Sequence, residues 1–156
     1  MKGAALVVPA SLLHPVGAAV PDGLAEDTLA RQEIERVAME EVMAAERALG
    51  REPRDVSSDK VGYDIESRDP ASGHLHFIEV KGRIDGGHTI TVTTNEMLVS
   101  LNAGERFVLA IVPVGESGFA HQPVYVRRPF DRAPDPDACA TIFKLDKLMP
   151  RGTAPC

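Results

Sequence analysis

The sequence predicts one α/β domain, and three observations lead to this prediction. A helical pattern of apolar residues comes first and is followed by short apolar segments typical of strands. A nearly continuous apolar run over residues 107–114 is typical of a strand that is buried on both faces of a sheet. A second helical segment precedes that run. The order helix, three strands, helix, strand therefore favours a mixed central sheet flanked by helices.

The first helix is expected from about Asp27 to Gly50. Asp27 or Thr28 can cap its start. Its apolar residues recur at three- or four-residue spacing: Ile34, Ala38, Val42, Ala45 and Leu49. Gly50 suits a helix C-cap and Pro53 does not continue a helix, so the helix is predicted to end there.

Short apolar segments after this helix are predicted as strands over residues 60–67, 75–81 and 89–93. The first two are joined by Asp69-Pro70-Ala71-Ser72-Gly73, a sequence with strong turn chemistry. They are therefore predicted to form an antiparallel hairpin, which would place Asp64 near Glu79.

The remaining segments continue the alternation of helices and strands. A second helix is expected over 95–103, a further strand over 123–128, an irregular proline-rich crossing over 129–136 and a short closing element over 141–149. Residues 1–25 are expected to form an N-terminal strand and linker, and residues 26–156 the domain itself. With 156 residues and 44% hydrophobic content, the chain can bury a core of its own.

The charge and cysteine content exclude some classes of protein. A formal net charge of −6 argues against a protein that binds nucleic acid by bulk electrostatics. Any contact with DNA must then be local, metal-assisted or helped by a tethered partner. Cys139 and Cys156 form neither a disulfide framework nor a metal-ligand pattern. No apolar run approaches the roughly 20 residues of a membrane helix, so we expect a cytoplasmic protein without a membrane partner.

A pair of charged residues, Glu79 and Lys81, interrupts the apolar strand predicted over 75–81. Because side chains alternate between the faces of a strand, these two point the same way and Val80 points the opposite way. A buried carboxylate is costly unless a counter-charge or a metal compensates. Together with Asp64 across the hairpin, they predict a functional site. The alternative is a cross-strand ion pair on a solvated face, with Asp64 an ordinary surface acid.

The local sequences around these residues are more informative about the family than the order of the elements. They read Glu35-Arg36-Val37-Ala38-Met39, Gly50-Arg51-Glu52-Pro53-Arg54-Asp55-Val56-Ser57, Gly62-Tyr63-Asp64-Ile65-Glu66-Ser67, Phe77-Ile78-Glu79-Val80-Lys81-Gly82-Arg83 and Val92-Thr93-Thr94-Asn95-Glu96. Over roughly residues 26–130 the chain resembles the NO VEIN C-terminal domain family. That family is a branch of the restriction-endonuclease-like PD-(D/E)XK nucleases and is often appended to helicases. Tyr63 stands where the usual superfamily pattern has Pro.

The resemblance implies a restriction-endonuclease-like αβββαβ core and a nuclease that cleaves DNA with Mg²⁺ or Mn²⁺. Asp64 and Glu79 would bind one or two of these ions, joined by the backbone carbonyl of Val80. Lys81 would hold the attacking water or stabilise the charge that builds on the phosphate. A helicase or ATPase domain or subunit as partner, and a homodimer for cutting duplexes, are expected by analogy.

The first helix is expected to supply one more metal ligand. The resemblance favours Glu35, which lies in a Glu-x-x-Ala pattern. Helical geometry instead favours Glu41, which lies at the centre of the apolar stripe and would be the most buried acid on the helix. Glu35 ranks slightly ahead because the Glu41 side chain can instead extend to solvent at the end of a narrow contact, and the two alternatives stay open.

Four polar residues are candidate nucleic-acid contacts: Arg83, Asn95, Arg127 and Arg128. Thr93 and Glu96 fit a capping box at the start of the second helix, and Glu96 can also face the metal site if that helix start borders it. A different function is a catalytically silent nucleic-acid-binding or docking module of a helicase-type protein. RNA in place of DNA also stays open.

Overall fold

The computed structural model describes residues 22–156, with side chains from Ala30 onward. The chain divides into a part up to Arg31 and a compact unit over Gln32–Cys156, and the contacts below are those of the second part. The main elements are α1 (Asp22–Ala48), β1 (Glu52–Asp55), β2 (Ile65–Arg68), β3 (Leu75–Ile84), β4 (Thr89–Thr93), α2 (Thr94–Ala103), β5 (Phe107–Val114), β6 (Val124–Arg127), β7 (Ala140–Lys144) and α3 (Leu145–Leu148). The fold is α/β, as predicted.

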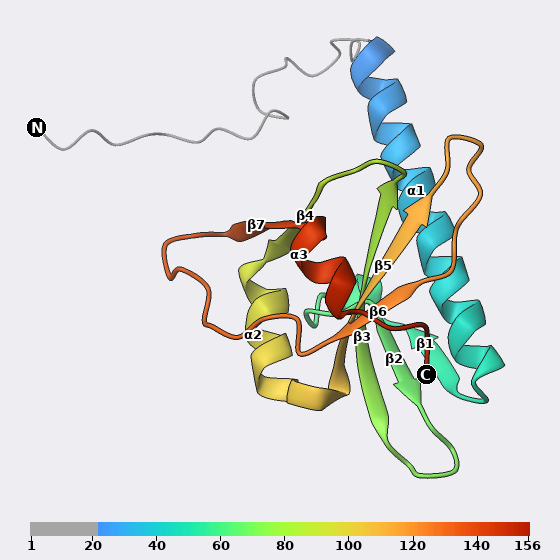
Figure 1. Ribbon diagram of the computed structural model, residues 1–156, viewed down its shortest axis with the longest axis vertical. Coiled ribbons are helices and arrows are strands. Elements are labelled where there is room, and N and C mark those ends of the chain that lie inside the picture. The colour runs from blue at the N-terminus through green and yellow to red at the C-terminus, as the bar shows by residue number, and fades with distance from the viewer. Residues whose placement is uncertain (1–21) are drawn as a thin grey trace, which may run out of the picture. The chain divides into compact units, whose positions relative to one another are not determined.

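The central sheet has five strands in the order β1-β2-β3-β5-β6 (Figure 1). β3 and β5 are parallel, and the other neighbours in this sheet are antiparallel, so the sheet is mixed. The parallel connection from β3 to β5 passes through α2, as parallel strands require a crossover. β4 lies outside the central sheet and pairs antiparallel with β7.

Most predicted elements are confirmed, and the differences have local causes. β2 and β3 form the predicted antiparallel hairpin, with Ile65 opposite Ile78. β2 begins five residues later than predicted because Lys60 and Gly62 adopt positive φ angles of 53° and 91°, which interrupt an extended strand. β1 is not among the predicted strands; it tolerates Pro53 because it lies at the edge of the sheet.

The first helix and the closing element also differ from expectation. α1 begins at Asp22, ahead of the predicted start near Asp27. The expected closing element is a strand, β7, followed by the single turn of α3. The predicted strand in the first residues of the chain and residues 1–21 of the predicted linker lie outside the described residues.

The core has two layers, one on each face of the central sheet. One layer joins Ala38 and Val42 of α1 to Ile78 of β3. The other joins α2 and β4 to the residues of β5 that face the opposite way, such as Leu109 and Ile111. This alternation along β5 explains why the strand is apolar throughout.

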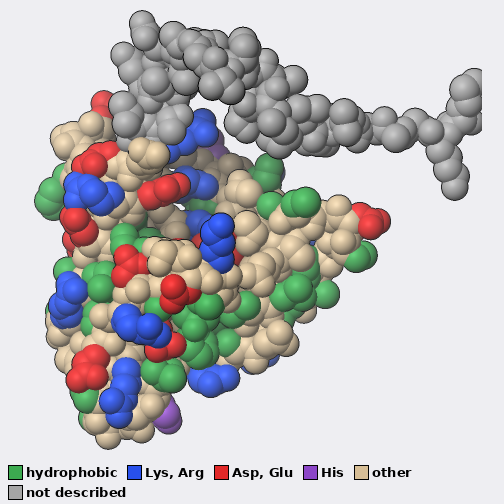
Figure 2. Space-filling view, turned by 180° about the vertical axis from the view of Figure 1, so that it is seen from behind, with side chains coloured by type: hydrophobic (Ala, Val, Ile, Leu, Met, Phe, Trp, Pro, Cys, Tyr) green, Lys and Arg blue, Asp and Glu red, His purple; other side chains and the backbone are tan. Residues whose placement is uncertain are grey.

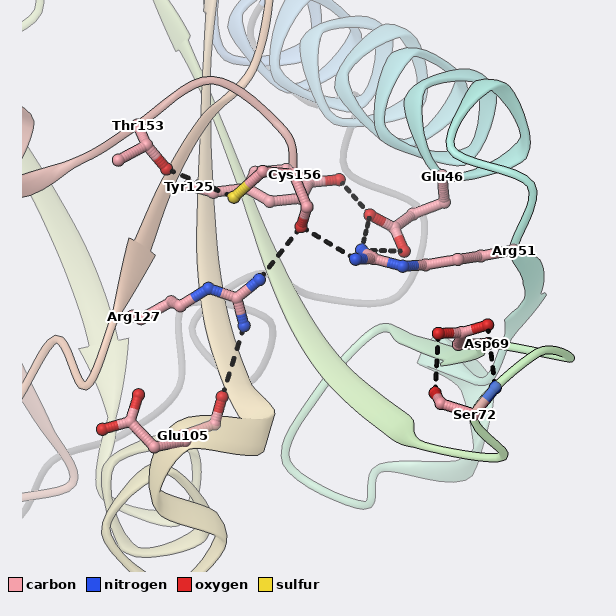
Figure 3. A network of polar contacts seen from close by, with 9 residues as sticks. All are labelled: Glu46, Arg51, Asp69, Ser72, Glu105, Tyr125, Arg127, Thr153 and Cys156. Atoms are coloured by element: carbon pink, nitrogen blue, oxygen red, sulfur yellow. Dashed lines mark hydrogen bonds and ion pairs between the residues drawn. The ribbon is translucent and has the colours of Figure 1, made fainter.

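The most buried acid of the described part of α1 is Glu46, which is 0% exposed. Its carboxylate accepts hydrogen bonds from the Tyr125 hydroxyl at 2.8 Å and from the Arg51 guanidinium at 3.2 Å (Figure 3). These two partners compensate the burial of the charge. The prediction that Glu41 is the most buried acid is therefore wrong, because Glu41 is only half-buried.

Within residues 22–156, none of the helices has the length and hydropathy that a bilayer span requires.

Candidate active site

The site begins where β2 ends. The backbone N–H of Asp64 still donates to Ile78 at 2.9 Å, but Asp64 lies just outside the β2 ladder. Its carboxylate turns toward the next stretch of β3 and accepts the backbone N–H of Val80 at 2.8 Å. A side chain thus takes the place of a strand partner, which holds the Asp64 carboxylate at the open edge of β3.

Glu79 and Lys81 lie on the face of the sheet that α2 covers. In the parallel register Glu79 is beside Leu109 and Lys81 is beside Ile111, two core residues of that face. Glu79 is 4% exposed and is therefore a buried acid among apolar neighbours. This contradicts the alternative that the pair lies on a solvated sheet face.

Lys81 is the cation of this cluster. Its Nζ lies 2.6 Å from Oε1 of Glu79 and 2.9 Å from Oε2 of Glu96. Asp64 contributes a third carboxylate and also interacts electrostatically with Lys81. Two carboxylates therefore pair with one ammonium group and a third lies near it, so this cluster of Asp64, Glu79, Lys81 and Glu96 keeps an excess of negative charge when all four side chains are ionised.

Glu96 reaches the cluster from the start of α2. The capping box predicted for Thr93 and Glu96 is present: the N–H of Glu96 donates to Oγ1 of Thr93 at 3.2 Å, and the N–H of Thr93 donates to Oε2 of Glu96 at 3.1 Å. The helix start also borders the pocket, so Glu96 both caps α2 and contacts Lys81. The sequence signal for Glu96 was its capping motif.

The electrostatics of the cluster follow from burial. Desolvation raises the pKa of Glu79 to about 8, and the nearby charges of Asp64 and Glu96 act in the same direction although Lys81 opposes them. Desolvation also raises the pKa of Asp64, partly offset by the Val80 N–H and Lys81. Burial lowers the pKa of Lys81, but the Glu79 and Glu96 carboxylates outweigh it and raise that pKa overall. The site lacks enough positive charge for its acids.

An open pocket of about 760 Å³ extends from this cluster. Asp64, Glu79 and Lys81 line it together with Glu35 of α1. Glu41 is not among its lining residues, so of the two candidate acids on α1 the structure brings Glu35 to the pocket.

Gly82 explains how α1 comes so close to the cluster. A Cβ atom at this position would lie 2.8 Å from the carbonyl oxygen of Ile34 and 3.0 Å from the Cβ of Ala38. Only glycine leaves room for the helix backbone at this distance from β3. The close approach places the turn that carries Glu35 beside the end of the cluster.

The candidate nucleic-acid contacts divide into two groups. Arg83 lines the pocket, with its guanidinium donating to the backbone carbonyls of Thr89 and Gly82. Asn95 lines a smaller adjoining pocket that it shares with Asp64 and Glu79.

Arg127 and Arg128 line neither of these two pockets. Arg127 donates to the backbone oxygens of Glu105 and Cys156, and Arg128 pairs with the Glu105 carboxylate (Figure 3 shows Arg127). The structure therefore does not bring these two arginines together with the predicted catalytic residues.

The donor atoms fit a hard divalent cation. Among the described residues, no three His, Cys, Asp or Glu side chains are grouped so that they could hold a metal ion, so Glu35 is not gathered with Asp64 and Glu79. Mg²⁺, however, commonly uses one or two carboxylates and completes its shell with water and substrate phosphates. The hydrogen bond to Val80 uses one Asp64 oxygen. Asp64 and Glu79, with too little counter-charge, suit such a site.

The surface around the site is not strongly basic. The pocket is lined by six acidic residues and three basic ones, and one of the basic residues, Arg36, is paired with Glu33 and Glu40. On the face shown in Figure 2, acidic and basic side chains of the described residues are interspersed. Positive charge is therefore not concentrated around this pocket.

Comparison with known proteins supports the resemblance seen in the sequence. The family model described as "Protein NO VEIN, C-terminal" matches residues 34–126, which is more than half of the chain. Neither the curated proteins nor the solved structures gave a match. The matched range runs from the turn of α1 that carries Glu35, through Asp64, Glu79 and Lys81, to β6. The chain therefore belongs to the NO VEIN C-terminal family.

Proposed function

We propose that this domain is a metal-dependent phosphodiesterase of the PD-(D/E)XK type that cleaves DNA. The observation that carries the proposal is that Lys81, its paired carboxylates Glu79 and Glu96, and the neighbouring Asp64 all line one pocket. A purely structural ion pair needs one carboxylate for one ammonium group. The additional buried acids are costly without a further cation.

Asp64 and Glu79 are the proposed ligands of Mg²⁺ or Mn²⁺, with the Val80 carbonyl and Glu35 as further candidates from the same pocket wall. The bound ion would polarise the scissile phosphate and lower the pKa of an attacking water. The protein holds the Asp64 carboxylate in place through the Val80 N–H, so this ligand needs little reorganisation when the ion arrives.

Lys81 supplies the positive charge that the protein itself brings to the reaction. A compact ammonium group with three donors can orient a water molecule and stabilise charge on a phosphate oxygen. Its position two residues after Glu79 places it on the same face of β3 as the metal ligand. One metal ligand and the ammonium group are thus held side by side on one strand of the central sheet.

The acidic surroundings bear on how DNA arrives. Because the pocket carries more acids than bases, phosphate contacts in it depend on the metal ion, Lys81 and Arg83. A helicase-type domain or subunit that delivers DNA would supply the missing affinity, and pairing of two domains would allow both strands of a duplex to be cut. Both belong to the proposal, as do a cytoplasmic location and a domain boundary near residue 26.

A second candidate function is a silent module that binds or docks nucleic acid beside a motor without cutting it. The charge of Arg36 is compensated by Glu33 and Glu40, and the pocket carries more acids than bases. Both observations favour this alternative over a free-standing nuclease. The test is cleavage of labelled single- and double-stranded DNA, and of RNA, with Mg²⁺, Mn²⁺ or EDTA.

The test compares the parent with Asp64→Ala and Lys81→Ala, and with Lys147→Ala as a control at an exposed lysine on α3. We expect metal-dependent cleavage of DNA by the parent and by the control, and none by the two site variants. Metal binding by the parent without cleavage of any substrate would favour the silent module. Preferential cleavage of RNA would change the substrate.

A further inference from the structure

Lys81 has two carboxylate partners that belong to different elements. Glu79 precedes it on β3, and Glu96 comes from the first turn of α2. If Glu79 turns to a metal ion, as the proposed function requires, its attraction for Lys81 is shared with that ion. The ammonium group then depends on its other partner to stay at the site.

We propose that Glu96 is a positioning residue, which keeps the Lys81 ammonium group directed at the reacting phosphate while Glu79 binds the metal ion. The inference rests on the proposed function and adds to it a residue outside the predicted set of Asp64, Glu79 and Lys81. It assigns the start of α2 a part in the reaction.

The geometry makes Glu96 the better fixed of the two partners. One oxygen atom, Oε2 of Glu96, accepts both the Lys81 ammonium group at 2.9 Å and the backbone N–H of Thr93 at 3.1 Å. The second contact belongs to the capping box, so the carboxylate is oriented by the helix backbone. A negative charge is also favoured at a helix N-terminus. Among the described residues, Glu79 has no such backbone anchor.

Burial supports the same assignment. The side chains of Lys81 and Glu96 are 15% and 14% exposed, so their pairing is shielded from water. Shielding strengthens the attraction between unlike charges. Removing the charge of Glu96 would leave Lys81 with Glu79 alone, and Lys81 would then compete with the metal ion for the same carboxylate.

Two substitutions separate this role from helix capping. Glu96→Gln keeps a side chain that can close a capping box but loses the charge that holds Lys81. Thr93→Ala removes the hydroxyl that caps the N–H of Glu96 and keeps the carboxylate. The measurements are kcat and KM for the DNA found to be cleaved, the affinity for Mn²⁺, and the melting temperature.

We expect Glu96→Gln to lower kcat by about tenfold or more, since charge stabilisation in the transition state is lost. KM for DNA should stay within about twofold because the metal ion and Arg83 still contact the phosphates. Thr93→Ala should keep kcat and lose only thermal stability. Equal losses of kcat in both variants, or an unchanged kcat in Glu96→Gln while the parent cuts, would overturn the role of Glu96.

Crystal structures with Mn²⁺ give a readout that does not need cleavage. In the parent, Lys81 should remain within hydrogen-bond distance of Glu96 while Glu79 contacts Mn²⁺. In Glu96→Gln it should leave this place. A parent in which Lys81 abandons Glu96 when Mn²⁺ binds would overturn the positioning role alone. A parent that retains the Lys81–Glu96 contact but cuts no nucleic acid would overturn the proposed function, and the catalytic role of Glu96 with it.

Discussion

Asp64 and Val80 are joined by a hydrogen bond that replaces a missing strand. The Asp64 carboxylate accepts the Val80 N–H at 2.8 Å, at the point of β3 where β2 no longer pairs. The carboxylate is half-buried and its pKa is raised by burial. It is therefore fixed in position while its charge is poorly compensated, as a metal ligand would be before the ion binds.

The first prediction concerns Asp64→Asn. The amide oxygen can still accept the Val80 N–H, and the variant removes a carboxylate whose ionisation burial disfavours. We expect a metal-free melting temperature equal to or above that of the parent, and loss of the rise that Mg²⁺ gives. For the parent at a Mg²⁺ concentration of 100 times Kd, binding raises the free energy of unfolding by about 2.7 kcal/mol. Thermal unfolding with EDTA and with Mg²⁺ tests this, and an equal Mg²⁺ response in both proteins would contradict it.

The second prediction concerns pH. Burial raises the pKa of Glu79 from 4.5 to about 8, so the folded protein binds a proton that the unfolded chain has released between these values. The free energy of unfolding should therefore fall as pH rises from about 4.5 to 8, by at most about 1.4 kcal/mol per pH unit from this residue. The stabilising contribution of the Glu79 proton is fully present below pH 4.5.

The measurement is urea unfolding of the metal-free parent and of Glu79→Gln at several pH values. Other residues titrate in the same range, among them His76, so the informative quantity is the difference between the two proteins. The difference in free energy of unfolding between the two proteins should change steadily from about pH 4.5 to 8. A difference that is constant from pH 5 to 8 would show that Glu79 does not titrate as inferred.

The third prediction separates the buried network around Glu46 from the candidate active site. Glu46→Ala leaves Arg51 and Tyr125 without their buried acceptor and should cost about 3–5 kcal/mol. Tyr125→Phe removes one hydrogen bond to a charged group and should cost about 1–3 kcal/mol. Both should keep the Mg²⁺-dependent rise in melting temperature. Loss of that rise in a folded Tyr125→Phe protein would show that the two regions are coupled.

The fourth prediction concerns the contact of α1 with β3. Gly82→Ala places a methyl group against the Ile34 carbonyl and should destabilise the protein by about 1–3 kcal/mol. It should also weaken Mg²⁺ binding if Glu35 is a ligand, because the helix must move outward. Gly115→Ala is the matched control, since a Cβ there meets only ordinary contacts. Equal stability of the two variants would contradict the close packing.

The sequence predicted the elements whose signals are local. The run 107–114 and the hairpin between β2 and β3 were clear from apolar pattern and turn chemistry, and the period of a strand placed Glu79 and Lys81 together. β1 was missed because Pro53 read as the end of a helix and not as an edge strand.

Local sequence patterns do not predict contacts between distant parts of the chain. The burial of Glu46 depends on Tyr125, 79 residues further along. The position of the Arg127 side chain depends on the backbone oxygens of Glu105 and Cys156, to which its guanidinium donates. The choice between Glu35 and Glu41 depended on the rotation of α1 against the sheet, which Gly82 helps to set but periodicity alone does not.

The short length of β2 has a consequence for solubility. From Glu79 to Ile84, β3 has β5 on one side and, in the described part of the chain, no strand on the other. A bare strand edge invites pairing with another molecule, and charged residues are a common defence. Here the Asp64 carboxylate takes the Val80 N–H and the Arg83 guanidinium takes the Gly82 carbonyl. Two side chains of the candidate site thereby occupy backbone groups of this edge that a strand of another molecule would otherwise bind.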